Sequence, residues 1–412
     1  MFNFKYESKK TKIFLIASSL IFLAFCIFSS LKYGESCLMG SIQKGDNDDV
    51  RYIRSAFVLI DEHKFISQRV NELTCYMMPG ITFILSFFML IFGKMQGIIA
   101  FRIFQGILQF FSLYLIYFIA RKFFGIKTGI AAVLIDEFYS AEIYAQVLIL
   151  TEVTFKFLVL LLIYISLYAL ETKKYKYYIE GGFLLGIACY VRPTIAMFPL
   201  VILIMWLIKK YSIKEMIKFA SIVSIIFCII LSPWWIRNYN VFHRFIPLTL
   251  STGNPFLQGT YINYNTKKDS LPYVHTTNGK SIIEINSIEI ETGKEKLKRD
   301  FKKEPVQYIY WYTIGKLIYM WNLPFYWQEI SGISMISAVL YHYFIVLIPG
   351  MLGIYFAIKN IKNYVYPLLC FAYLNAVYLP YFTCSRYAYP AAPLLIIFSA
   401  LYIQRKWIKQ KE

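Results

Sequence analysis

Ten long apolar runs follow one another along this chain, and they limit its possible folds more than any other feature. A helix that crosses a bilayer needs about 20 predominantly apolar residues, and most of these runs approach that length. We therefore expect an all-α polytopic membrane protein with about 10 transmembrane helices, because helices satisfy their own backbone hydrogen bonds in lipid. The runs cover residues 13–30, 98–120, 127–142, 152–170, 178–191, 193–208, 215–232, 337–357, 364–381 and 386–404.

Composition and charge support a membrane location. Of the 412 residues, 58% are hydrophobic and 16% are charged, whereas a soluble domain is about 45–50% apolar. The net charge of +19 could suggest nucleic acid. However, Lys and Arg form short clusters between the apolar runs rather than one basic face, which is typical of charges that set membrane topology. We therefore expect membrane lipids and no nucleic acid as partners.

The basic clusters also predict an orientation. With a cytoplasmic N-terminus, every cluster between spans falls on the cytoplasmic side if the apolar segment 81–92 does not cross. The C-terminal sequence RKWIKQKE then lies in the cytoplasm too. At about 12 residues, segment 81–92 is short for a span, so we expect a juxtamembrane or re-entrant helix there. Two substantial segments, 31–97 and 233–336, are left on the extracytoplasmic face of the cell membrane.

This topology divides the chain into three parts. Residues 1–232 form an N-terminal transmembrane catalytic module with the first external loop, 31–97. Residues 233–336 form a second external segment, which is short for a catalytic domain of its own. Its aromatic stretch 306–322 is expected to be a helix at the membrane interface, with a buried hairpin as the alternative. Residues 337–412 supply the C-terminal transmembrane helices.

The first external loop carries three carboxylates within four positions, Asp46, Asp48 and Asp49. Acidic residues in a loop are commonly just solvated, and we interpret Asp46 in that way. Asp48 sits four residues before Tyr52, at the start of a weakly amphipathic helical stretch. We therefore rank Asp48 first as a reactive carboxylate, with Asp49 as its neighbour.

Four more ionisable residues lie near the outer ends of the predicted spans: Glu152, Arg192, Arg237 and Arg386. Function is the default interpretation for such residues at membrane depth, although an arginine at a span end often serves only as an anchor. Arginine binds phosphate through forked, charge-assisted hydrogen bonds. A nearby carboxylate can act as general base for an acceptor hydroxyl or amine. This combination suits the transfer of a sugar from an anionic lipid carrier.

Several motifs together resemble a known family in their order and spacing. They are Asp48-Asp49-Val50-Arg51-Tyr52 with Ala56; Pro79-Gly80; Phe124-Gly125 with Gly129; Leu150-Thr151-Glu152; Gly186 through Arg192-Pro193; Pro233-Trp234 with Arg237-Asn238; Glu304-Pro305 with Lys316 and Trp321; and Arg386-Tyr387 with Pro390. On these motifs the chain resembles integral-membrane glycosyltransferases of the GT-C superfamily. It is most similar to the bacterial branch of dolichyl-phosphate-mannose protein mannosyltransferases and lipid A aminoarabinose transferases.

The resemblance implies roles for particular residues. It implies that Asp48 is the catalytic base, that Asp49 supports it, and that Arg192 helps to bind a lipid phosphate. It also implies an extracytoplasmic site and inversion at the anomeric carbon. The full set of candidates is Asp48, Asp49 and Glu152 for catalysis, and Tyr52, Arg192, Arg237 and Arg386 for substrate binding. The expected partners are a polyprenyl-phosphate sugar donor and an envelope glycan, lipid or protein acceptor.

Cysteine and histidine spacing predicts no metal centre of the usual Cys/His kind. A divalent cation that bridges carboxylates and phosphate is still compatible with the residues, because hard cations prefer oxygen ligands. Cys37 and Cys75 flank the acidic segment and could form a disulfide or stay as two thiols.

An alternative function is a transporter or flippase of a lipid-linked glycan, in which the same arginines would line a path. Few charges fall near mid-span and no internal repeat is evident, so the sequence favours the enzyme. A non-catalytic membrane scaffold is a third possibility. The abundance of Lys, Ile and Tyr is typical of a bacterium with AT-rich DNA.

Overall fold

The computed structural model describes all residues except 1–3, 6, 68, 70–71, 267–278 and 410–412. In the described residues, the regular secondary structure is helical. The one β-type contact among them is an isolated bridge between Ile330 and Ile333. The predicted all-α class is therefore confirmed.

Six helices in the described part of the chain are long and apolar enough to cross a membrane, and each coincides with a predicted span. They are α1 (Lys9–Tyr33), α4 (Lys94–Phe124), α7 (Glu152–Thr172), α10 (Ile213–Phe242), the continuous stretch Met335–Lys359, and the stretch Ser385–Lys406. The stretch Met335–Lys359 contains α15 (Met335–Tyr341), the π-helical turn η5 (His342–Leu347) and α16 (Ile348–Lys359). The last stretch contains α18 (Ser385–Ala388), the 3₁₀ turn η6 (Tyr389–Ala391) and most of α19 (Ala392–Lys409).

The other predicted spans correspond to shorter helices. They are α5 (Ile126–Glu137) with α6 (Ser140–Val147), α8 (Tyr175–Val191), η1 (Pro193–Met197) with α9 (Pro199–Ile208), and α17 (Ile361–Ala376). We expected one helix over 127–142, but Tyr139 has extended backbone dihedrals and separates α5 from α6. The chain therefore changes direction there, which turns Glu142 into the protein interior.

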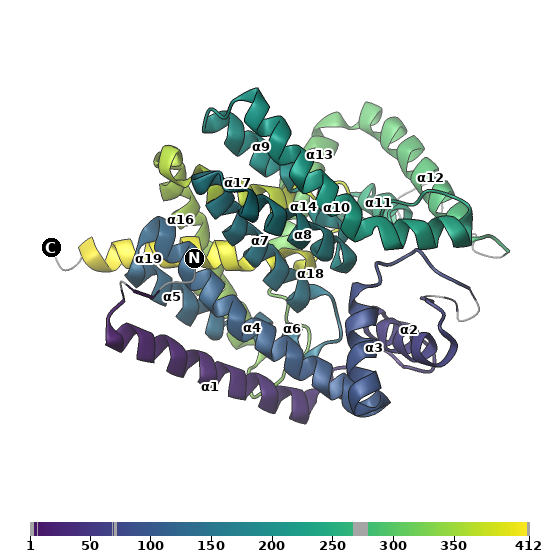
Figure 1. Cartoon of the computed structure of the whole chain (residues 1–412), viewed down its shortest axis with the longest axis horizontal. Helices are drawn as coiled ribbons and strands as arrows, with labels where there is room; N and C mark the ends of the chain where they lie inside the picture. Colours follow the sequence, from purple (N-terminus) through teal and green to yellow (C-terminus); the bar gives the residue numbers. More distant parts are fainter. Residues whose placement is uncertain (1–3, 6, 68, 70–71, 267–278, 410–412) are drawn as a thin grey trace.

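The long helices run side by side along the long axis of the molecule (Figure 1). At one end α1 begins and α19 ends, and at the other end four helices gather. These four are α2 (Asp48–Glu62), α3 (Gly80–Phe92), α11 (Gly253–Gly259) and α12 (Ile282–Lys303). They come from the two segments expected outside the membrane. Which side of the membrane this end faces remains a prediction.

Helix α3 coincides with the predicted juxtamembrane segment 81–92. It has 13 residues, fewer than a membrane span requires. One face of α3 is buried, including Leu85, and the opposite face exposes Phe87 and Leu90. At the start of α3 the backbone approaches α8 so closely that a Cβ on Gly80 would lie 2.5 Å from the Tyr190 carbonyl oxygen. Only glycine fits this contact, and it fixes the end of α8 against the first external loop.

The aromatic stretch expected at the interface is helical, not a hairpin. It consists of α13 (Pro305–Tyr310), the π-helical turn η4 (Trp311–Gly315) and α14 (Lys316–Trp321). Trp311 and Lys316 are buried on one side, whereas Val306 and Ile309 are exposed on the other. Such a two-faced helix is what an interfacial position requires.

Candidate active site

The acidic segment forms the first turn of α2. Asn47 caps the helix, since its side-chain oxygen accepts a hydrogen bond of 2.9 Å from the Asp48 amide. Asp48 and Asp49 both lie in this first turn, where the helix dipole favours negative charge. The local sequence therefore fixes the two carboxylates at one helix end and aims them in different directions.

Asp49 points into the protein and is fully buried. Its two carboxylate oxygens accept hydrogen bonds from the backbone amides of Met39, at 2.6 Å, and Val50, at 2.8 Å. Burial raises the pKa of the Asp49 carboxyl above its ordinary value, although these amide hydrogen bonds oppose the shift. Asp49 thus ties the preceding loop to α2. Asp46 is exposed and accepts a hydrogen bond from the Ser41 amide.

Asp48 points the other way and is 47% exposed at its side chain. Its Oδ2 accepts a hydrogen bond of 2.8 Å from Arg386 Nη1. Arg51 Nη1 lies 3.7 Å from Asp48 Oδ1. Partial burial alone would raise the pKa of Asp48, but the positive charge and hydrogen bond of Arg386 outweigh it, so the pKa lies below its ordinary value. Asp48 is therefore an ionised carboxylate that water and small molecules can reach.

Glu152 is the first residue of α7 and is completely buried. Its carboxylate accepts hydrogen bonds from Arg386 Nε and Arg192 Nη2. A buried carboxylate must be paired to remain charged, and here one carboxylate serves two guanidinium groups. Glu152 therefore holds two arginines side by side.

Arg192 lies between α8 and η1 in an extended conformation, with φ −145° and ψ 121°. Pro193 follows it, and a proline disfavours helical dihedrals in the preceding residue. Helix α8 therefore ends at this point. The Arg192 side chain reaches α7, where Nε donates a hydrogen bond of 2.6 Å to Thr151 Oγ1.

Arg386, on the short helix α18, joins the carboxylates of Asp48 and Glu152. Its side chain is 12% exposed. Asp48, Glu152, Arg192 and Arg386 thus form one continuous set of ion pairs, which we call the Arg386 cluster. Its members come from α2, α7, the end of α8 and α18, so the site combines the first and third predicted parts of the chain.

The structure also shows where the two remaining candidates lie. Tyr52 is buried one turn after Asp48 on α2, and the charges of Asp48 and Arg386 act on its phenol, whose pKa is raised mainly by burial. Arg237 lies apart. Its Nη1 donates to the Thr74 carbonyl at 2.7 Å and to Asn238 at 2.9 Å. No contact between Arg237 and the Arg386 cluster is found among the described residues.

Sequence reasoning missed a polar group behind this cluster. Glu142 and Lys156 form a buried ion pair, and Asp136 is also buried, with Oδ2 3.9 Å from Lys156 Nζ. A signal was present in the sequence, because Lys156 interrupts an apolar run four residues after Glu152. Spacing of i and i+4 places both side chains on one face of α7.

The arrangement of oxygens does not fit a divalent cation. Arg386 occupies the position between the carboxylates of Asp48 and Glu152, and both oxygens of Asp49 accept backbone amides. Among the described residues, no group of three or more His, Cys, Asp and Glu side chains is placed to hold a metal ion. Cys37 and Cys75 are buried free thiols, so the possible disulfide is not formed.

An apolar cavity of about 390 Å³ lies between α7, α8, α9 and α10. It follows α8 from Tyr177 to Leu185 and includes Ala196 and Phe198. These last two residues follow Arg192 by only four and six positions. The cavity therefore adjoins the segment that carries one arginine of the Arg386 cluster.

Comparison with known proteins shows what this chain is similar to. The sequence profile of the family described as "Dolichyl-phosphate-mannose-protein mannosyltransferase" matches residues 78–236, which include Glu152 and Arg192. The apo oligosaccharyltransferase of Archaeoglobus fulgidus is similar in structure, with a TM-score of 0.60 and 12% sequence identity over 98% of this chain. The family model matches less than half of the chain, and the structural likeness, at 12% identity, concerns the fold. The chain is therefore similar to membrane glycosyltransferases in its fold and, over residues 78–236, in its sequence.

Two further structures of the archaeal enzyme are similar to this chain, each with a TM-score of 0.53 and 12% identity. One is tethered to an acceptor peptide with the NVT sequon, and the other is a complex with Zn and sulfate. They cover 95% and 96% of this chain. The chain itself spans about half the length of these solved structures, 52%, 50% and 49% respectively. The comparison with curated protein sequences gave no match.

Proposed function

We propose that this protein is a GT-C glycosyltransferase. It transfers a sugar from a polyprenyl-phosphate donor to an acceptor at the extracytoplasmic face of a bacterial cell membrane, with Asp48 as the general base. One observation carries the proposal. A half-exposed, ionised carboxylate is held by Arg386 in a buried cluster with a second arginine. The site therefore offers a base and two phosphate-binding groups within one set of contacts.

The charges of the site favour an anionic donor. Asp48 and Glu152 balance Arg192 and Arg386, and Arg51 adds one positive charge beside Asp48. A phosphate diester carries one negative charge, so its binding neutralises the excess. Guanidinium groups match phosphate oxygens in forked geometry. We assign phosphate binding to Arg386 and Arg192, with Glu152 as the carboxylate that holds both in place.

Donor binding also prepares the base. Asp48 is the more exposed of the two carboxylates that Arg386 contacts, so it is the one that a phosphate displaces. Once Arg386 has turned to the phosphate, the pKa of Asp48 returns toward its ordinary value, because the stabilising positive charge now faces another anion. A carboxylate with a higher pKa is a stronger base. The donor thus activates Asp48 on arrival.

The transfer is a single displacement with inversion. The acceptor oxygen or nitrogen attacks the anomeric carbon, and its proton passes to the Asp48 carboxylate. The bond from the anomeric carbon to the phosphate oxygen breaks, and its electron pair leaves with the polyprenyl phosphate. Arg192 and Arg386 stabilise the charge that develops on the leaving phosphate. Tyr52 packs beside the base, and Asp49 fixes the loop around it.

The apolar cavity supports a lipid-borne donor. Its lining is almost wholly apolar, it follows α8, and it adjoins the segment that begins at Arg192. A polyprenyl chain in this cavity would lie among Leu185, Phe198 and their neighbours while its phosphate reaches Arg192. Arg237 lies beside the first external loop, where we propose that it meets the acceptor or the sugar.

The test is transfer by the purified protein in proteoliposomes. Radiolabelled polyprenyl-phosphate mannose serves as the probe donor, and an extract of the native cell envelope supplies glycan, lipid and protein acceptors. Asp48→Asn should reduce transfer by about 10²–10⁴-fold, the usual contribution of a general base. The matched control Asp46→Asn, in the same loop, should transfer at the wild-type rate. Passage of the intact lipid across the bilayer without sugar transfer would establish a flippase instead.

A further inference from the structure

A fully buried polar network lies directly behind the Arg386 cluster. Its centre is Glu142 Oε2, which accepts hydrogen bonds from Tyr389 Oη at 2.6 Å, from Gln109 Nε2 at 2.7 Å and from Lys156 Nζ. Gln109 Nε2 also donates to Tyr389 Oη at 2.7 Å. We call Gln109, Glu142, Lys156 and Tyr389 the Glu142 network. None of these four side chains is needed by the proposed transfer chemistry.

Two members of the network are close in sequence to Glu152 and Arg386, the two central residues of the site. Lys156 follows Glu152 by one helical turn on α7, and Tyr389 follows Arg386 by three residues. Glu142 contacts both Lys156 and Tyr389. The carboxylate on α6 therefore fixes α7 and the segment after α18 relative to each other, and these two elements carry the Glu152–Arg386 pair.

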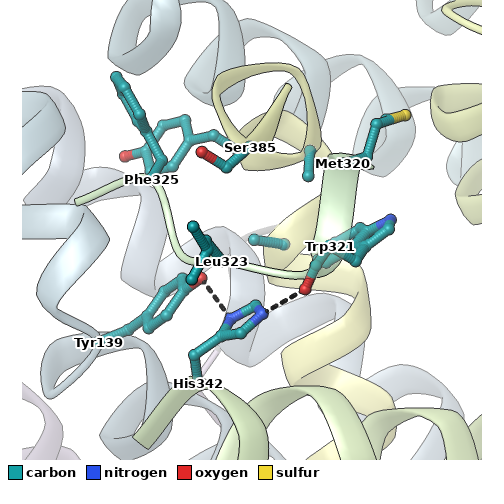
Figure 2. Close-up of a pocket in the computed structure, with 10 residues that line it drawn as sticks. Tyr139, Met320, Trp321, Leu323, Phe325, His342 and Ser385 are labelled. Atoms are coloured by element: carbon teal, nitrogen blue, oxygen red, sulfur yellow. Dashed lines mark hydrogen bonds between the residues drawn. The ribbon is translucent and has the colours of Figure 1, made fainter. Parts of the chain in front are cut away.

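Other side chains also contact α18, including Trp327, whose Nε1 donates a hydrogen bond of 3.2 Å to Ser385 Oγ. Figure 2 shows Tyr139, His342 and Trp321 in a chain of hydrogen bonds near Ser385, the residue before Arg386. His342 Nε2 lies 2.7 Å from the Trp321 carbonyl oxygen and Nδ1 lies 2.9 Å from Tyr139 Oη. Because a carbonyl only accepts, Nε2 carries the proton and Nδ1 accepts from Tyr139.

The cavity between this chain and α18 measures about 10 Å³, room for at most one water molecule. Its lining includes Ser385, Ala388 and Tyr389. On this side α18 therefore meets packed side chains. The hydrogen bond of Tyr389 to Glu142 is the contact that links this part of the chain to α6 and, through Lys156, to α7.

We propose that the Glu142 network positions Arg386 against Glu152 and Asp48 for sugar transfer, and that Tyr389 is its positioning residue at α18. This inference rests on the proposed function. The network touches neither donor nor acceptor. It acts through Arg386, whose guanidinium must reach the donor phosphate and Asp48 within hydrogen-bond distance. A displacement of about 1 Å at such a group can cost about 10²-fold in rate.

The test compares Tyr389→Phe with a matched control, Tyr366→Phe. Tyr366 is also a buried tyrosine whose hydroxyl donates one hydrogen bond, to the Ile163 carbonyl at 2.8 Å. With polyprenyl-phosphate mannose, Tyr389→Phe should lower kcat by about 10–100-fold and change KM less than about threefold. Tyr366→Phe should leave both within about twofold. An equal loss of kcat in both variants would show that Tyr389 contributes only to packing, and would overturn the inference.

A second readout is independent of transfer. Cys384 is partly exposed and lies two residues before Arg386, whereas Cys228 is the one exposed thiol among the described cysteines. In a Cys228→Ser background, a membrane-impermeant maleimide should label Cys384 severalfold faster in Tyr389→Phe than in Tyr366→Phe or wild type. Equal labelling rates would overturn the positioning role. If wild-type protein transfers no sugar, the proposed function fails, and the labelling still decides the role of Tyr389.

Discussion

Glu152→Gln should destabilise the protein much more than Asp48→Asn, although both should abolish transfer. Glu152 is fully buried and is paired with both Arg192 and Arg386. Glu152→Gln removes the negative charge that pairs with both guanidinium groups, so two adjacent positive charges repel each other in a buried position. Removing one partner of a buried ion pair typically costs about 3–5 kcal/mol. Asp48 is 47% exposed, and Arg386 remains paired with Glu152 when Asp48 is replaced by a neutral residue. Asp48→Asn should therefore cost about 0–1 kcal/mol of stability.

The assay is the apparent Tm of each purified protein in detergent, followed by fluorescence-detected size exclusion after heating. Large proteins lose about 2–4 °C of Tm per kcal/mol. Glu152→Gln should therefore lower the apparent Tm by about 6–20 °C, and Asp48→Asn by about 4 °C or less. A control, Glu62→Gln, changes an acid that is half exposed and paired with Lys64, and it should behave like wild type.

A second substitution identifies the cause of the destabilisation. In the Glu152→Gln background, Arg192→Met removes one of the two adjacent positive charges, and Arg386 still pairs with Asp48. The double variant should therefore be more stable than Glu152→Gln alone. The reasoning is refuted if Glu152→Gln melts at the same temperature as Asp48→Asn, or if Arg192→Met lowers the Tm of the double variant further.

Three other predictions follow from the same contacts. Arg386 holds the pKa of Asp48 below its ordinary 3.8, so the ion pair stabilises the donor-free protein above pH 3.8. This contribution to stability is lost as the pH falls through the lower pKa of the folded protein. A series of melting curves from pH 3 to 7 should show the loss in wild type and not in Asp48→Asn. Arg192→Lys keeps the charge but loses the forked hydrogen bonds, so KM for polyprenyl-phosphate mannose should rise about tenfold or more, as steady-state kinetics would show. Asp49→Asn weakens the hydrogen bonds that two buried backbone amides donate to the Asp49 carboxylate. It should therefore cost about 1–3 kcal/mol of stability, measured by the same melting assay.

Helix positions were largely predictable from this sequence because lipid requires long apolar helices. The predicted juxtamembrane segment 81–92 and the span 152–170 match α3 and α7 closely. The break at Tyr139 was not predictable, because no proline or glycine, the residues that commonly end a helix, stands between Asp136 and Glu142. Only tertiary contacts, such as the hydrogen bond between Tyr139 and His342, show why the chain turns there.

The site was predictable as a set of residue types, but not as a set of contacts. Asp48 and Arg386 are 338 positions apart, and nothing in either local sequence encodes their pairing. The sequence ranked Asp48 before Asp49, but their different contacts emerge only in the structure, where Asp48 faces Arg386 and Asp49 faces backbone amides. Arg237 resembles Arg192 in sequence context, since both stand near a proline, yet it contacts Thr74 rather than Glu152.

The central claim is that Asp48 acts as a base and does not bind the donor. It is tested most directly by measuring donor binding and turnover on the same Asp48→Asn protein. Decaprenyl phosphate should bind to this variant as tightly as to wild type, or more tightly, because Arg386 is no longer shared with Asp48. Turnover of polyprenyl-phosphate mannose should fall by about 10²-fold or more. Wild-type turnover by Asp48→Asn, or a loss of binding that matches the loss of turnover, would contradict the account.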